Sequence, residues 1–435
     1  MRENAAIVDG KTRGMFPVRA CDSNQLASNN PNEDRRIVGR LLSDNSSLFC
    51  VLDGHGGPEC AQTVSERLFD YIAVSLMSES ELEDYYNSLR DGPPQQLVQY
   101  YTFSNAYEEI SMRQIYRHSL QNFVLGSLST WVDLCDLTPS QRIDRAIRQL
   151  DCDILSEAIT TPNPTNLYAI RSAISGCVGT VVYVKDVDMV IANFGDCRVI
   201  CGKYDVDGSW KLEELTTDHD VHCQSEVERV RSEHPMNEHQ DLFAYDRLMG
   251  VLLPLRAMGD GQLKWPLSDI KKIEHVINKQ ITPYAYRTPP YLTSNPEMTN
   301  VTLTSRDRFV VLASDGLWGT LKSEEVVQIV GEHMETIETP SRAFFDPTVA
   351  LGPMNRVLKK RRMILANKQK SIDPNTATHL IRKSLPDEHV KASQALTYPQ
   401  HVVRHIRDDI TVIVVHFDDA FISNFLGDDS IVMGD

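Results

Sequence analysis

The feature that most constrains this chain is an apolar run, residues 48–52, that leads directly into Asp53-Gly54-His55-Gly56. An ionised carboxylate at the end of a buried strand is costly unless a cation or hydrogen-bond donors neutralise it. The glycines on either side of His55 let the backbone approach a ligand closely. Considered alone, the pattern is more often a strand that ends in an Asp-Gly turn, so the rest of the chain has to decide between the two interpretations.

The same arrangement occurs twice more. The apolar run 309–313 leads into Ser314-Asp315-Gly316, and Arg407-Asp408-Asp409 leads into the apolar run 410–415. Three strands far apart in the sequence thus each carry a carboxylate at one end, and Glu33-Asp34 adds two more near the start. An all-oxygen ligand set suits hard cations such as Mg²⁺ or Mn²⁺ better than zinc. The sequence therefore predicts a metal site on which these acids converge.

Length and composition narrow the class of protein. The chain has 435 residues, 41% hydrophobic and 24% charged, which is ordinary for a globular enzyme. Length alone would allow two or three domains, but acids at 33–53, 315 and 408 can meet only if both ends of the chain close into one domain. A net charge of −16 argues against broad nucleic-acid binding. No apolar stretch approaches the roughly 18 residues that a membrane span needs. Nine scattered cysteines do not resemble a disulfide framework and indicate a reducing compartment.

Strands and helices are expected to alternate in blocks, which favours two packed sheets with helices outside. A clear amphipathic helix begins at Thr138-Pro139 and places four apolar residues on one face, namely Ile143, Ile147, Leu150 and Ile154. Further helices are expected over 64–74, 222–233 and 324–332. A hairpin is expected from 180–184 and 189–193, followed by a strand at 198–200 and a turn at Asp207-Gly208.

Three segments are expected to be additions to this frame. They are an insertion over about 80–135 that is helical in part, a Pro-rich irregular flap over a cleft at about 262–300, and an insertion over about 333–372. The last contains a basic run, residues 359–362, which is either a solvated loop or a contact for an acidic partner.

Two other metal patterns are weak. A zinc site built from Cys197, Cys201, His219, His222 and Cys223 fits no standard spacing, and cysteine is commonly buried without a metal. The segment 205–208 faintly resembles a calcium loop but lacks the later ligands, so a hairpin turn is expected there.

If Asp53, Asp315 and Asp408 converge, their mutual repulsion would protonate one of them unless cations bind. Two divalent ions resolve this, with Asp53 bridging them and the Gly54 carbonyl supplying a further oxygen. Such a pair can activate a bridging hydroxide for attack on a phosphoester. His55 could then protonate the leaving alkoxide, or alternatively orient Asp53 or a water. Other two-metal hydrolases, nucleases included, stay open on this evidence, although the acidic composition and the lack of a basic groove weigh against nucleases.

The order of motifs resembles that of the metal-dependent serine/threonine phosphatases of type 2C. The resemblance covers about residues 22–417 and rests on Glu33-Asp34, Asp53-Gly54-His55-Gly56, Gly195-Asp196, Arg256-Ala257-Met258-Gly259-Asp260, Ser314-Asp315-Gly316-Leu317-Trp318 and Arg407-Asp408-Asp409-Ile410-Thr411. Segments 22–26, 64–69, 71–76, 288–293 and 377–382 are similar to the pyruvate dehydrogenase phosphatase branch of that family, which also carries both long insertions.

This resemblance implies an α+β fold, with a central β-sandwich of two antiparallel sheets flanked by helices on both sides. It implies a phosphatase domain over 22–417, between an N-terminal extension at 1–21 and a C-terminal tail at 418–435. Two Mg or Mn ions would be held by Asp53, Gly54, Asp315 and Asp408, with Glu33 acting through a metal-bound water and Asp196 contributing to a third ion. The expected catalytic residues are His55 and Asp53.

The resemblance also implies a mitochondrial matrix enzyme, although no transit peptide is evident in this chain. Its substrate would be the phosphorylated first component of the pyruvate dehydrogenase complex. Its partners would be a lipoyl domain of the complex core, with calcium at that interface, and a larger regulatory subunit. The alternatives are another phosphoprotein substrate or an inactive pseudophosphatase scaffold. A scaffold would have lost Asp53, Asp315 or Asp408, and all three are present.

The chain departs from the general type 2C pattern at a few positions. Asn29 stands where many members carry an arginine that grips phosphate, so another group is expected to hold the substrate. Val178 replaces a threonine, Leu255 replaces a serine before Arg256, and Gly319 stands where several relatives carry an acid near the third ion.

Overall fold

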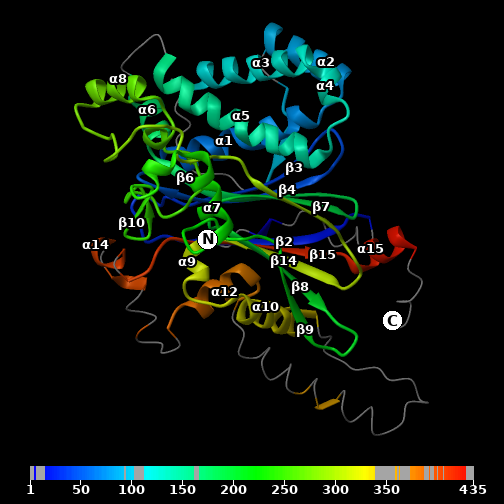
Figure 1. Ribbon diagram of the computed structural model, residues 1–435. Helices are drawn as coiled ribbons and strands as arrows, with labels where there is room; N and C mark the ends of the chain where they lie inside the picture. Colours follow the sequence, from blue (N-terminus) through cyan, green and yellow to red (C-terminus); the bar gives the residue numbers. More distant parts are fainter. Residues whose placement is uncertain are drawn as a thin grey trace.

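The computed structural model describes residues 4–5, 15–92, 95–101, 112–160, 166–338, 358–359, 362, 373–386, 391, 396–398, 400–404 and 406–427. Two sheets form the centre of the molecule (Figure 1). The first has the order β1-β2-β15-β14-β8-β9, with β1 (Asn4–Ala5), β2 (Val18–Leu26), β8 (Arg198–Tyr204), β9 (Trp210–Glu214), β14 (Asp307–Ala313) and β15 (Ile410–Phe417).

The second sheet has the order β13-β7-β6-β4-β3-β5, with the short β12 beside β6. Its strands are β3 (Arg35–Leu41), β4 (Ser47–His55), β5 (Val98–Tyr100), β6 (Gly176–Lys185), β7 (Asp188–Phe194), β12 (Met258–Gly259) and β13 (Glu297–Thr302). The strand pairs of both sheets are antiparallel. The predicted α+β sandwich is therefore confirmed.

Helices cover the outer face of each sheet. On the second sheet and around it lie α1 (Glu59–Leu76), α2 (Glu79–Asp91), α3 (Arg113–Ser129), α4 (Trp131–Leu134), α5 (Pro139–Thr160), α6 (Leu167–Ile174) and α8 (Leu267–Ile277). On the first sheet lie α10 (Ser323–Glu338) and α12 (Thr376–Ser384), which pack on its strands β8, β9, β2 and β15. The shorter connections contain α7 (Gln224–Glu233), β10 (Phe243–Ala244), β11 (Arg247–Leu248), α9 (Asp315–Trp318), α14 (Gln400–Val403), α15 (Asp419–Leu426) and the 3-10 turns Met236–Glu238 and Gly261–Leu263.

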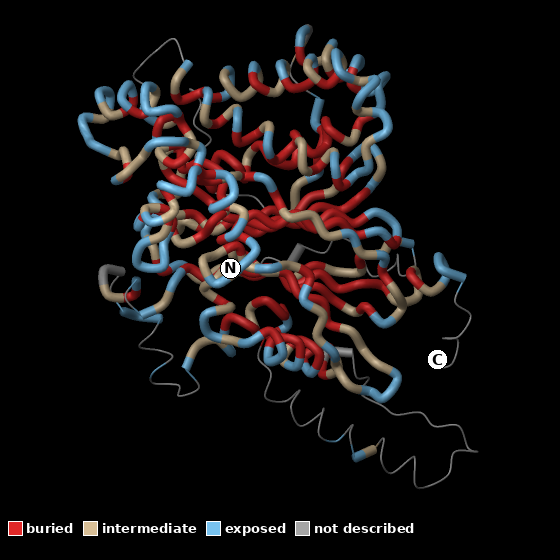
Figure 2. Tube along the Cα trace, viewed as in Figure 1, coloured by how far each residue is buried: buried red, intermediate tan, exposed pale blue. Residues whose placement is uncertain are grey.

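The apolar runs are continuous because the strands are buried on both faces (Figure 2). In β4, Phe49 and Val51 pack between the sheets with residues of β14 and β15, whereas Leu48 and Leu52 pack beneath α1. Alternate residues of a strand point to opposite faces, so a strand between two apolar layers shows no polar alternation. The same holds for β14, whose Phe309 belongs to the cluster under α10 and α12.

The helix predicted from Thr138 is α5, and all four of its expected apolar residues are buried. Its start is fixed by a reciprocal cap, in which the Thr138 N–H donates to Gln141 Oε1 at 2.9 Å and the Gln141 N–H donates to Thr138 Oγ1 at 3.3 Å. The two bonds satisfy the backbone N–H groups of Thr138 and Gln141 at the start of the helix. The hairpin at 180–193 and the third strand are confirmed as β6, β7 and β8. The expected helices are confirmed as α1, α7 and α10, each with somewhat different ends.

Two expectations about segment boundaries were wrong. The segment 262–300 is irregular mainly over 278–296, because it also contains α8, whose Ile270 and Ile273 are buried in the core under α5. The sandwich also extends beyond 22–417, since Val18 in β2 and Ile422 in α15 are core residues. In both cases the apolar residues have helical or alternating spacing, but polar residues between them make this periodicity hard to recognise in the sequence.

The insertion at 80–135 is helical in part, as expected, with α2, α3 and α4. It also adds β5 as an edge strand beside β3. Most of the insertion at 333–372 lies outside the described residues, as do Lys360 and Arg361 of the basic run. Among the helices of the described residues, none combines the length and apolarity that crossing a bilayer requires.

Candidate metal centre

Asp53 lies near the end of β4, a strand in the middle of the second sheet between β3 and β6. The strand pairs with β6 to its very end, so that Asp53 lies opposite Val178 and His55 opposite Gly176. Apolar residues on both faces hold the strand as far as Leu52, and the chain becomes polar only where it leaves the sandwich. The position of Asp53 is therefore fixed by the sheet rather than by a loop.

Asp315 and Asp408 come from neighbouring strands of the first sheet. In the antiparallel pair β14–β15, Ala313 lies opposite Val412, so the end of β14 meets the start of β15. Asp315 follows the first and Asp408 precedes the second. Gly316 permits this approach, because a Cβ there would lie 2.0 Å from the Asp409 carbonyl oxygen. Antiparallel pairing thus brings together two acids that are 93 residues apart, from 315 to 408.

A pocket of about 280 Å³ brings together the residues that the sequence proposed as metal ligands or catalytic residues. It lies at the end of the sandwich where α9 and β10 are seen in Figure 1. Its lining includes the residues expected to bind metal or to act in catalysis, which are Glu33, Asp53, Gly54, His55, Asp196, Asp315 and Asp408. It also includes Asn29 and Val178, two of the positions that depart from the family pattern, and Arg247 and Arg404, which the sequence reasoning missed.

The carboxyl groups of the pocket repel one another. Burial and the charges of Asp34, Asp315, Asp196 and Asp408 raise the pKa of Asp53 well above its usual range. Burial and the nearby Asp315 raise the pKa of Asp196 to about 7. Burial and Asp408 likewise raise the pKa of Asp315. A cation bound among these carboxylates would lower their pKa values again.

The residues fit divalent cations. Asp315 Oδ1 is buried and has no hydrogen-bond partner, although a buried carboxylate oxygen normally has one. All the acids around it offer oxygen, the donor that Mg²⁺ and Mn²⁺ prefer. A cation at this position would satisfy the orphaned oxygen and offset the repulsion at once.

Glu33 and Asp34 differ in their surroundings. Glu33 lines the pocket, as expected of a residue that acts through a bound water. Asp34 is buried behind it, where Ser314 Oγ donates to Asp34 Oδ2 at 2.8 Å. Burial raises the pKa of Asp34 to about 8. Asp34 therefore joins the N-terminal loop to the Asp315 loop.

Asp409 serves the loop at 28–33 rather than the pocket. It accepts hydrogen bonds from the backbone N–H groups of Ser28, Asn29 (2.8 Å) and Glu33 (2.9 Å). The side chain of Asn29 also donates to Asp409 Oδ2 at 3.0 Å. The two adjacent acids thus have different tasks, and Asp408 is the one that faces the pocket.

His55 is paired with an acid that the sequence reasoning named only as part of a motif. Its Nε2 lies 2.7 Å from Asp260 Oδ2. Burial disfavours the protonated ring, but the charge and hydrogen bond of Asp260 outweigh this and raise the pKa of His55. Gly176 makes room for the pair, since a Cβ there would lie 2.0 Å from Asp260 Oδ2 and 2.3 Å from His55 Nε2. A histidine with a raised pKa that is held by an acid is suited to donate a proton.

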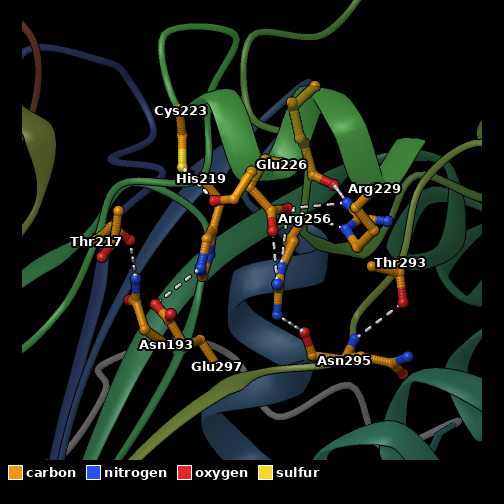
Figure 3. A network of polar contacts seen from close by, with 12 residues as sticks. Asn193, Thr217, His219, Cys223, Glu226, Arg229, Arg256, Thr293, Asn295 and Glu297 are labelled. Carbon is orange, nitrogen blue, oxygen red and sulfur yellow. Dashed lines mark hydrogen bonds and ion pairs between the residues drawn. The ribbon is translucent and has the colours of Figure 1, made fainter. Parts of the chain in front are cut away.

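The backbone that leads into Asp196 is ordered by a polar network that includes Asn193, Thr217 and His219 (Figure 3). The preceding Gly195 N–H donates to His219 Nδ1 at 3.1 Å, and its carbonyl accepts from the His219 N–H at 3.0 Å. Asn193 Nδ2 ties the Gly195 carbonyl to that of Thr217, at 3.2 and 3.0 Å. His219 is thereby engaged in ordering this loop.

The network continues to α7, where Glu226 accepts from both Arg256 and Arg229 (Figure 3). Burial opposes ionisation of Glu226, but the hydrogen bonds from Arg256 and Arg229 lower its pKa to about 2. Arg229 also donates to the Leu255 carbonyl at 2.9 Å. This cluster fixes the segment 242–255, which carries one wall of the pocket, against the sandwich.

The tightest group of potential ligand atoms in the described part of the chain lies elsewhere. Atoms of Cys201, Glu213 and Asp307 are all within 4.8 Å of one another. Lys203 already provides the cation there, with Nζ 2.7 Å from Glu213 and 3.3 Å from Asp307. This trio is unrelated to the predicted acids and needs no metal.

The chain is similar to known proteins over most of its length. The family model of Protein phosphatase 2C matches residues 112–346. The chain is 37% identical over 435 residues to pyruvate dehydrogenase (acetyl-transferring) phosphatase 1, mitochondrial, from Bos taurus, covering 94% of this chain and 79% of that protein. It is also 35% identical over 443 residues to pyruvate dehydrogenase (acetyl-transferring) phosphatase 2, mitochondrial, from Homo sapiens. That match covers 96% of this chain and 82% of that protein. A solved serine-threonine phosphatase 2C from Toxoplasma gondii aligns with a TM-score of 0.47 and 15% identity, over 92% of this chain and 97% of that one.

Proposed function

Because the chain belongs to the protein phosphatase 2C family, we propose that it is a metal-dependent protein serine/threonine phosphatase that acts on phosphorylated pyruvate dehydrogenase. The observation that carries the chemistry is the single pocket that holds Asp53, Asp315, Asp408 and His55. The observation that carries the substrate is the 37% identity, over 94% of the chain, to a phosphatase named for pyruvate dehydrogenase. The names of the relatives likewise support a mitochondrial location.

In this proposal Asp53, Asp315, Asp408 and the Gly54 carbonyl hold two Mg or Mn ions, with Glu33 acting through water. When bound, the ions would supply an activated water as nucleophile and positive charge for the phosphoryl oxygens. Asp196 lines the same pocket and is the candidate for a third, weaker ion.

The chain's own residues perform the proton transfer. In the protonated ring, His55 Nε2 donates to Asp260, so the proton available to the substrate is the one on Nδ1. We infer that this Nδ1 proton passes to the serine oxygen as the phosphoester bond breaks, because a serine alkoxide is a poor leaving group. Asp260 keeps the ring oriented and favours its protonated form. A general acid of this kind contributes on the order of a hundredfold or more to the rate.

The experiment that tests the proposal measures phosphate release from the phosphorylated first component of the pyruvate dehydrogenase complex in Mg²⁺ and in Mn²⁺. A generic phosphoserine peptide is compared at equal concentration. We expect kcat/KM for the phosphorylated component to be the higher. An equal or lower value would redirect the search to another phosphoprotein, and no release from any phosphoprotein would contradict phosphatase activity itself.

The same assay addresses the partners. We propose that a lipoyl domain of the complex core docks on this chain with calcium held between the two proteins, and that a larger regulatory subunit binds as well. Calcium should then raise the rate on the assembled complex, because docking brings substrate close. It should leave the rate on a small aryl phosphate unchanged or lower it by competing with Mg²⁺. Stimulation on the aryl phosphate would instead indicate a calcium site within this chain.

A further inference from the structure

Two arginines bring positive charge to a pocket that acids otherwise dominate. Arg247 and Arg404 line it together with the candidate metal ligands. Both side chains are exposed and come from segments far apart in the sequence. Among the described residues of the lining, they are the two that stay cationic throughout the physiological pH range.

We propose that Arg247 and Arg404 bind the phosphoryl group of the substrate and align it in the pocket. This inference rests on the proposed function, because it names the residues that contact substrate at the same site.

The charge of the pocket requires such groups. Five carboxylates line it, those of Glu33, Asp53, Asp196, Asp315 and Asp408. Two divalent cations carry four positive charges, so with all five ionised one negative charge is left on the lining. The protonated His55 does not offset this charge, because its own charge is paired with Asp260. A phosphate group with two negative charges would then be repelled. Two guanidinium groups offset that repulsion and present paired N–H donors that match phosphate oxygens.

Asn29 cannot take this role. It also lines the pocket, but its side chain is neutral. Its Nδ2 donates to Asp409 at 3.0 Å and its backbone N–H donates to the same carboxylate at 2.8 Å. Asn29 therefore holds its own loop, and the donors for phosphate have to come from other segments.

Arg247 is held over the pocket by a well-anchored segment. It belongs to β11, which pairs with β10 through a tight turn. Leu248 and Leu252 beside it are buried, and the Leu248 N–H donates to the Leu252 carbonyl at 2.7 Å. One guanidinium nitrogen of Arg247 donates to the Val251 carbonyl at 3.1 Å. A guanidinium has five N–H donors, so this bond orients the group and leaves donors for a ligand.

Arg404 approaches from the C-terminal side. It follows α14, whose Val403 is buried and accepts from the Arg407 N–H at 3.0 Å. Arg407 in turn donates to the Ala27 carbonyl at 2.9 Å, which ties this segment to the end of β2. Arg404 lines the pocket together with Glu33, so its guanidinium shares the cavity with a pocket acid.

The test measures phosphate binding directly as well as turnover. Arg247→Gln, Arg404→Gln and the double variant are titrated with inorganic phosphate at fixed Mg²⁺. KM and kcat are measured on a phosphoserine peptide and on p-nitrophenyl phosphate. We expect each single change to raise the Kd of phosphate and the KM of both substrates about tenfold, since charge-assisted bonds are lost, with kcat changed less than about threefold.

The control variant is Arg306→Gln. Arg306 is exposed and precedes β14, whereas Asp315 follows that strand, so it lies at the opposite end of the sandwich. It should leave phosphate binding unchanged. Arg247→Lys and Arg404→Lys should restore part of the affinity, because they keep the charge but lose the planar fork. These lysine variants also decide the question if a glutamine variant fails to fold.

An unchanged Kd of phosphate in both glutamine variants would overturn the proposal. A raised KM for the peptide with unchanged phosphate affinity would overturn it too, because the arginines would then contact the peptide. If the wild-type chain hydrolyses no phosphoprotein, the proposed function fails, whereas the phosphate titration still decides whether these arginines form an anion site.

Discussion

At the scale of single residues, the pocket depends on buried acids that repel one another. Asp53 is surrounded by Asp34, Asp196, Asp315 and Asp408, and its pKa is raised as a result. Repulsion among these carboxylates destabilises the folded protein unless bound cations offset it. The convergence of these acids from β4 and from the ends of β14 and β15 gives the site its capacity for divalent cations.

The first prediction concerns these acids. Asp53→Asn and Asp315→Asn should each lower kcat on a phosphoserine peptide by about a thousandfold or more, because a lost metal ligand removes transition-state stabilisation of several kcal/mol. Circular dichroism should show an unchanged fold. Asp207→Asn, in the exposed turn between β8 and β9, is the control and should keep full activity. Near-normal turnover by either pocket variant would remove that residue from the ligand set.

The second prediction separates acid catalysis by His55 from metal orientation. His55→Ala should slow a phosphoserine peptide about a hundredfold more than p-nitrophenyl phosphate, because an aryl oxide leaves without a proton. Asp260→Asn should show the same bias in a weaker form, since it acts through His55. His275→Ala on the exposed face of α8 should change neither rate. Equal losses on both substrates would contradict the acid role.

At the scale of secondary-structure elements, the two helices on the first sheet are joined by a pair of histidines. His333 of α10 and His379 of α12 stack with ring centroids 4.4 Å apart and an interplanar angle of 11°. His333 is buried, and its Nε2 has no hydrogen-bond partner. Burial and the neighbouring His333 lower the pKa of His379 to about 4, with Lys383 adding to the shift and Asp373 opposing it. The helices therefore pack through neutral rings.

The third prediction follows from that lowered pKa. Between about pH 6.5 and pH 4 the unfolded chain binds a proton at this residue and the folded chain does not. The stability that the neutral pair provides is therefore complete above pH 6.5 and is lost as the pH falls toward 4. The loss should be on the order of 2 kcal/mol, below the full linkage value because the ring of His379 is partly exposed.

Urea unfolding between pH 7 and pH 4 measures this dependence. His379→Gln should flatten the slope over that window, whereas His222→Gln, an exposed histidine before α7, should leave it unchanged. An identical slope in wild type and His379→Gln would show that the stacked pair does not control stability in acid.

At the scale of the whole molecule, the pocket lies where the two sheets meet. Asp53 belongs to β4 of the second sheet, whereas Asp315 follows β14 and Asp408 precedes β15 of the first sheet. Charge repulsion between them acts across the sandwich, and a shared cation would join the two sheets. Metal binding and global stability should therefore be linked.

The fourth prediction tests that link. Adding Mg²⁺ after removal of metals with EDTA should raise the Tm by a few degrees, because a ligand that binds only the folded state adds about 2.7 kcal/mol at a hundred times its Kd. Asp315→Asn should be at least as stable as the wild type in EDTA, since one repelling charge is gone, but should gain less from Mg²⁺. Asp207→Asn should behave like the wild type. A full Mg²⁺ shift in Asp315→Asn would place the cations elsewhere.

The sequence by itself determined the strands that carry the acids, the amphipathic helix α5 and the hairpin β6–β7. These depend on local periodicity, capping and turn chemistry, which near neighbours in the chain decide. The expected convergence of Asp53, Asp315 and Asp408 also followed from the sequence, because unpaired acids at the ends of buried strands need a common partner.

Only the tertiary structure decided which distant groups meet. It placed Asp260 against His55, 205 residues away in the sequence. It gave Asp409 the role of binding the backbone of the loop at 28–33. It also brought Arg247 and Arg404 into the pocket. It also showed α8 packed in the core where an irregular flap was expected. Such contacts depend on strand order and pairing register over the whole chain, and no local pattern of residues encodes these, because the energy that selects them comes from packing between segments far apart in sequence.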